Sequence, residues 1–118
     1  QRLRQKDLRV VLMGGPAERS RLNAMSVPDG IVVAPELPLR PFAAAISHAR
    51  AVVTADTGPM HVCVALGLPT VELFSHTETW RFGYGHIPGQ VIIDSGGRLA
   101  TVDEAWSALG TLLSDPRT

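Results

Sequence analysis

The stretch from Asp56 to His61 has the residue types and spacing of an anion site. Gly58 lets a ligand approach the backbone, and the start of a helix presents unpaired N–H groups and the positive end of the helix dipole. Thr57 adds a hydroxyl, and His61, in the first helical turn, can donate to a phosphate or leaving-group oxygen. Asp56 would hold a hydroxyl, cap the helix or orient His61. The alternative is an ordinary strand-to-helix turn with a capping Asp or Thr.

A second glycine turn, Gly14-Gly15-Pro16, is followed by Glu18 and repeats this logic. Gly15 would allow close approach to the main chain. A glutamate near the end of a strand can accept both hydroxyls of a ribose. The same glutamate could equally be there because an acidic residue suits the first turn of a helix.

The other side chains that could bind a ligand or react can also be explained by an ordinary structural role. A loop rich in aromatic residues could stack on a ligand or cover the core; it contains Trp80, Arg81, Phe82 and Tyr84. The spacing of the remaining histidines suggests no metal site, so we expect structural or solvated roles for His48, His76 and His86. Cys63 lies between two valines on an expected buried helix, where a core role is more natural than nucleophilic catalysis.

Length and composition limit the classes of protein that fit. The 118 residues suit one globular domain, 1–118, and a formal net charge of zero argues against nucleic-acid binding through phosphate electrostatics. A single cysteine excludes an internal disulfide, and the sequence has no apolar run long enough to span a membrane and no signal peptide. We expect a cytoplasmic protein. Because the chain starts at Gln1 rather than Met, we also expect it to be part of a longer protein.

The pattern of elements predicts an α/β fold. Apolar runs predict strands at 8–13, 31–34, 51–55, 70–74 and 91–94. Helices are expected after Pro16, from Pro41, over 60–66 and over 102–113, the last with a capping box formed by Thr101 and Glu104. Such alternation is typical of a Rossmann-like parallel sheet with helices on both faces, which binds ligands at the carboxyl ends of its strands. The loops that matter are therefore 14–18, 56–61 and 75–90.

The string Asp-Thr-Gly-x-x-His, followed by Ala-Leu-Gly-x-Pro-Thr, resembles the C-terminal half of glycosyltransferase family 9, the ADP-heptose:lipopolysaccharide heptosyltransferases and their relatives. The resemblance implies the donor-binding half of a GT-B enzyme, with Thr57 and Gly58 on the diphosphate, His61 beside it, Asp56 on sugar or phosphate and Glu18 on the ribose. The expected donor-binding residues are Gly15, Glu18, Asp56, Thr57, Gly58 and His61.

The resemblance also implies a reaction, the transfer of a heptose-like sugar from an ADP-sugar to a lipopolysaccharide core acceptor. The catalytic base would come from an N-terminal domain outside this chain, and the residues present would contribute no catalytic group except His61 as a leaving-group stabiliser. We expect no cofactor and no metal, and only weak donor binding by the chain alone. The protein would be cytoplasmic, either free or peripheral at the inner face of the inner membrane.

The family strand order 3-2-1-4-5-6 would leave this chain without its central first strand. We expect the remaining strands to close the gap, in the order 31–34, 8–13, 51–55, 70–74, 91–94.

Two other functions remain open. One is a non-catalytic module that binds a nucleotide or phosphate ligand in the same loops, which transfer of sugar by the intact protein would exclude. The other is a flavodoxin-like interaction domain without a ligand, favoured if the 75–90 loop covers the 56–61 turn.

Overall fold

The computed structural model describes residues 2–55, 57–74, 87–96 and 98–114. The chain forms two compact units, Gln1–Phe42 and Ala43–Thr118, and each is described by itself. Whether the chain acts as a single domain stays a prediction.

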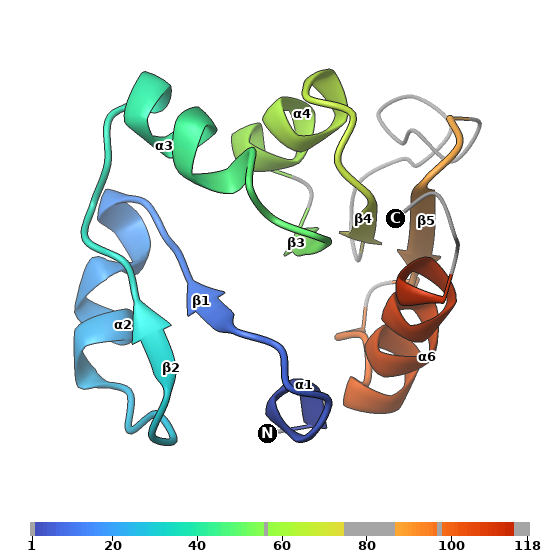
Figure 1. Ribbon diagram of the computed structural model, residues 1–118, viewed down its shortest axis with the longest axis horizontal. Coiled ribbons are helices and arrows are strands. Elements are labelled where there is room, and N and C mark those ends of the chain that lie inside the picture. The colour runs from blue at the N-terminus through green and yellow to red at the C-terminus, as the bar shows by residue number, and fades with distance from the viewer. Residues whose placement is uncertain (1, 56, 75–86, 97, 115–118) are drawn as a thin grey trace. The chain divides into compact units, whose positions relative to one another are not determined.

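The first unit contains a two-stranded parallel sheet (Figure 1). Its elements are α1 (Arg2–Gln5), β1 (Val10–Leu12), the 3-10 helix η1 (Pro16–Glu18), α2 (Arg19–Ala24) and β2 (Ile31–Val33). The strands run side by side in the same direction, with Val10 opposite Ile31 and Leu12 opposite Val33. The helix α3 (Leu39–Ile46) begins in this unit.

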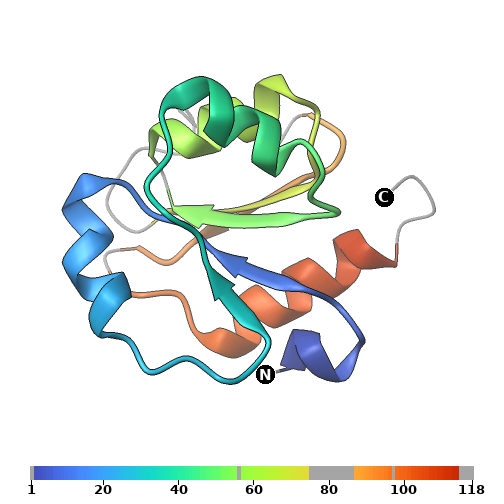
Figure 2. The same ribbon diagram turned by 60° about the vertical axis from the view of Figure 1, so that its left-hand side comes forward.

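The second unit contains a three-stranded parallel sheet in the order β3-β4-β5. Its strands are β3 (Val52–Ala55), β4 (Thr70–Phe74) and β5 (Gln90–Asp94), and its helices include α4 (Gly58–Ala65) and α6 (Val102–Leu113). Helix α4 packs on β3 and β4, whereas α6 packs on β4 and β5 from the opposite face (Figure 2). The unit is thus a helix–sheet–helix sandwich, as apolar parallel strands require.

The core of the second unit is centred on β4. Side chains from both of its faces are fully buried, because Val71 packs on one side of the sheet while Thr70, Glu72 and Phe74 alternate onto the other. The facing helices contribute apolar residues of equally low exposure, namely Met60, Cys63, Leu109 and Leu112. A strand covered on both faces explains why Val71, Leu73 and Phe74 are apolar although they alternate between the two faces.

The five expected strands are found in parallel pairs, but one expected pairing is wrong. We predicted that the strand at 8–13 lies beside the strand at 51–55, whereas the described ladders join β1 to β2 and β3 to β4 to β5. The pairs found are the neighbours 3-2 and 4-5-6 of the family order, in which a further strand separates the two groups. The apolar pattern of a strand shows that it belongs to a sheet but does not specify which strand lies beside it. The sequences of 8–13 and 51–55 therefore could not show that the two strands do not pair.

Helix α6 begins at the capping box that the sequence predicts. The Thr101 hydroxyl accepts a hydrogen bond from the Glu104 N–H at 3.1 Å, and the Glu104 carboxylate accepts one from the Thr101 N–H at 3.4 Å. Arg98 donates to the same carboxylate at 2.8 Å. The Arg98 hydrogen bond, with smaller contributions from Thr101, lowers the pKa of Glu104 below its ordinary value.

Replacing the N-cap tests how much this start contributes to stability. Thr101→Ala should lower the free energy of unfolding by about 1 kcal/mol, because an N–H at the helix start loses its acceptor. Urea denaturation of Thr101→Ser, which keeps the hydroxyl, is the control and should show a much smaller loss. Equal losses in the two variants would contradict the capping role.

The lowered pKa of Glu104 predicts a pH-dependent part of the stability. A carboxyl whose pKa is lower in the folded state than in the unfolded state stabilises the fold when the pH is above the unfolded-state pKa. This stabilisation is lost as the pH falls through the folded-state pKa. The stability difference between the unchanged protein and Glu104→Gln should therefore be present at pH 7, begin to fall near pH 4.5 and disappear as the pH drops through the lower pKa of the folded state. In an Arg98→Met background the pH-dependent part should shrink, and a difference that persists to pH 2 would refute the ion pair as its cause.

Candidate functional site

The first turn of α4 is open to solvent around Gly58. Thr57 is the N-cap, with extended backbone angles (φ −143°, ψ 175°), and among the described residues its hydroxyl does not cap the helix but donates to the Ala55 carbonyl at 3.4 Å. The N–H of Met60 returns to the Thr57 carbonyl at 3.1 Å. Gly58 is exposed, and a Cβ added there would meet no atom within 4 Å. An anion can therefore approach the backbone at the positive end of the helix dipole.

His61 is exposed at the end of the first turn of α4, four residues after Thr57, and a helical side chain at this place leans toward the helix start. Pro59 follows Gly58 at the beginning of the helix, where its missing N–H costs no helical hydrogen bond. Asp56 lies outside the described residues. Thr57, Gly58 and His61 thus form one group of the expected site residues.

Gly15 and Glu18 form the other group, in the first unit. The Glu18 N–H donates to the Gly15 carbonyl at 3.1 Å, and a Cβ added to Gly15 would lie 3.4 Å from Glu18 Oε2. The glutamate carboxylate therefore lies over the glycine backbone at the turn that follows β1. A carboxylate held over a glycine turn can accept a pair of vicinal hydroxyls while the ligand packs against the bare main chain.

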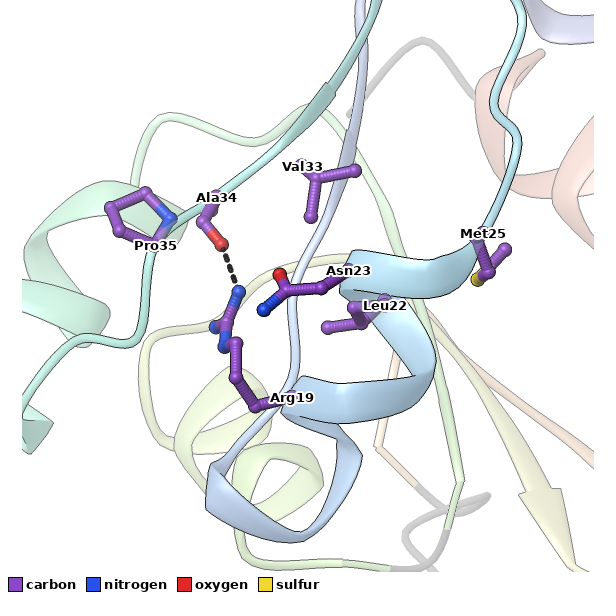
Figure 3. A pocket seen from close by; sticks show the side chains of 7 residues that line it. All are labelled: Arg19, Leu22, Asn23, Met25, Val33, Ala34 and Pro35. Atoms are coloured by element: carbon purple, nitrogen blue, oxygen red, sulfur yellow. Dashed lines mark hydrogen bonds between the residues drawn. The ribbon is translucent and has the colours of Figure 1, made fainter.

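A cavity of about 500 Å³ lies between α2 and the exit of β2 (Figure 3). Arg19 forms one wall of it: its Nη1 donates to the Ala34 carbonyl at 2.9 Å and its Nη2 to the Gly14 carbonyl at 3.2 Å. The side chains of Asn23, Leu22 and Met25 line the helix side. Arg19, which lines the cavity, directly follows Glu18 in the chain.

The remaining sequence expectations have different outcomes. Cys63 is 1% exposed, and burial raises the pKa of its thiol, with a smaller opposing effect from a backbone hydrogen bond, so its core role is confirmed. His48 is exposed. The aromatic residues at 80–84 and the histidines at 76 and 86 lie outside the described residues. The roles assigned to the expected donor-binding residues stay predictions.

The described residues contain neither a cluster of metal ligands nor a membrane-spanning helix. No three of their His, Cys, Asp and Glu side chains gather in a way that could hold a metal ion. Within the same residues, no helix has the length and apolar character needed to cross a membrane.

The arrangement of parallel strands and helices matches solved glycosyltransferase structures of the GT-B type. The E. coli heptosyltransferase WaaC with ADP superposes with a TM-score of 0.78 at 24% identity, over 93% of this chain and 36% of that one. The E. coli ADP-heptose LPS heptosyltransferase II gives a TM-score of 0.79 at 23% identity, over 99% of this chain and 40% of that one. These likenesses establish the fold.

Sequence comparison establishes the family. Residues 1–96 match the model of glycosyltransferase family 9 (heptosyltransferase), and the chain belongs to this family. A stretch of 66 residues is 38% identical to lipopolysaccharide heptosyltransferase 1 of Pseudomonas aeruginosa, covering 55% of this chain. The chain spans 19% of the length of that relative.

Two charged residues with unusual surroundings were not singled out from the sequence. Glu72 is fully buried in the central strand, although it stands in an apolar run. Arg19 occupies the first position of α2, where the helix dipole disfavours a cation. In both cases a charged residue stands where the sequence pattern favours an uncharged one, and this mismatch could have drawn attention to both residues.

The packing around the first glycine turn predicts unequal effects of two alanine substitutions. A Cβ on Gly14 would lie 2.7 Å from Leu22 Cδ1, which can rotate away, and 3.0 Å from Glu18 Cβ, which cannot, so Gly14→Ala should lower the free energy of unfolding by about 1 kcal/mol. Gly58→Ala, which meets no neighbour, should change it by less than about 0.5 kcal/mol. Thermal or urea unfolding measures both, and equal destabilisation would contradict this account of the turn.

Proposed function

We propose that this chain is the donor-binding part of a glycosyltransferase that moves a heptose-like sugar from an ADP-sugar to a lipopolysaccharide core acceptor. The observation that carries the proposal is the open first turn of α4, where exposed Gly58 lies between Thr57 and His61 at the positive end of the helix dipole. Family membership supports it, as does the likeness to a heptosyltransferase whose solved structure contains ADP. The activity of the whole protein is part of the proposal.

In this proposal the diphosphate binds at the start of α4. The Gly58 N–H and the Thr57 hydroxyl donate to phosphate oxygens, and the helix dipole favours the negative charge that grows there as the sugar–phosphate bond breaks. His61 donates to the departing diphosphate and is the leaving-group stabiliser. No metal is part of the proposal, because these donors already face the charge that develops.

Glu18 is proposed to hold the ribose. Its carboxylate lies 3.4 Å from the position of a Gly15 Cβ, so the glycine leaves room for the sugar beside it. Asp56 is assigned to the donor sugar or phosphate by the family pattern alone. The acceptor and the base that deprotonates its hydroxyl belong to other parts of the protein, which we propose to act in the cytoplasm or at the inner face of the inner membrane.

The test is an amide NMR titration of the protein with ADP, with UDP and GDP as controls. ADP should selectively shift the amide signals of Gly15, Glu18, Thr57, Gly58 and His61. Glu18→Gln should weaken ADP binding about tenfold, because a neutral amide accepts ribose hydroxyls more weakly than a carboxylate does. Ser47→Ala, on an exposed residue after α3, is the matched control and should bind ADP unchanged.

Two outcomes would contradict the proposal. If ADP shifts none of these amides at millimolar concentration, the donor-binding role is wrong. If ADP binds but the intact protein transfers no sugar from an ADP-heptose donor, the alternative of a non-catalytic nucleotide-binding module replaces it.

A further inference from the structure

Arg19 makes an unusual connection between the ends of two strands. Gly14 follows β1 and Ala34 follows β2, and the two carbonyls accept hydrogen bonds from the two terminal nitrogens of the same guanidinium, at 3.2 and 2.9 Å. The strand ladder itself ends at the Ala34 N–H, which donates to the Leu12 carbonyl at 2.9 Å. The arginine therefore continues the connection beyond the last hydrogen bond between the strands. Figure 3 shows its bond to the Ala34 carbonyl.

Helix stability does not explain an arginine at this place. Arg19 is the first residue of α2, next to the positive end of the dipole, and both of its acceptors are uncharged carbonyls. Its third nitrogen, Nε, is buried without an acceptor in the described part of the chain. What this position requires is the planar guanidinium, whose two terminal nitrogens have a fixed separation and can donate to two carbonyls at once.

The geometry points to Arg19 as a positioning residue that acts through Glu18, an inference that rests on the donor site proposed above. Glu18 is its direct neighbour in the chain and the N-cap of α2, with backbone angles of φ −97° and ψ −6°. Fixing Arg19 to the strand ends fixes the junction between η1 and α2. This junction sets the direction in which the Glu18 carboxylate leaves the backbone, over Gly15.

The inference predicts an effect on one part of the ligand only. Arg19→Lys replaces the fork by a single ammonium that cannot hold both carbonyls in the same geometry. ADP, which has a ribose, should bind about tenfold more weakly, whereas inorganic pyrophosphate, which has none, should bind as before. Arg21→Lys, on an exposed arginine of the same helix, is the matched control and should leave both affinities unchanged.

A double-mutant cycle separates positioning from general destabilisation. Once Glu18 is changed to Gln, Arg19→Lys should cost little further ADP affinity, since Arg19 acts through the lost carboxylate. Calorimetry with ADP and pyrophosphate measures all four proteins. If Arg19→Lys does not fold, Arg19→Gln, which keeps one donor for the Ala34 carbonyl, takes its place.

Unchanged ADP binding in Arg19→Lys, fully additive losses in the cycle, or an equal loss with pyrophosphate would each overturn the inference. Failure of the unchanged protein to bind ADP would instead refute the proposed function itself.

Discussion

The parallel ladder through β4 is the constraint on which the second unit depends. β4 pairs with β3 on one edge and with β5 on the other, and most of its side chains are buried. A strand held in this way cannot slip by one residue without turning its buried side chains to the wrong face. The register therefore determines where β3 ends, and with it the place at which Thr57 and Gly58 turn the chain into α4.

Each of the two groups of candidate site residues is arranged around a glycine. In the second unit, the start of α4 offers N–H groups beside a glycine with free space around it. In the first unit, Glu18 lies over another glycine, and Arg19 binds two carbonyls. A glycine leaves the main chain bare, so a ligand can approach it closely while a neighbouring side chain supplies the polar contact. This is the common physical basis of the two groups.

Local signals were enough to predict some features and not others. Thr101 and Glu104 are three residues apart, so their capping box depends on nothing distant. By contrast, the 8–13 run forms only the strand Val10–Leu12, since a strand extends only as far as its partner, and the pairing expected beside 51–55 required a neighbour that these residues do not provide. The contacts of Arg19 depend on a carbonyl that is distant in the sequence, so its surroundings could not be predicted from the helix alone.

The hydrogen bond from Arg50 Nη2 to the Leu113 carbonyl, at 3.0 Å, joins residues that are 63 positions apart. Arg50 lies just before the first strand of the second unit, and Leu113 is the last residue of its last helix. This bond ties the segment that leads into β3 to the carboxyl end of α6. The two helix layers on opposite faces of the sheet are thereby joined at one side of the unit, because the loop before β3 cannot move away from the end of α6 without breaking this hydrogen bond.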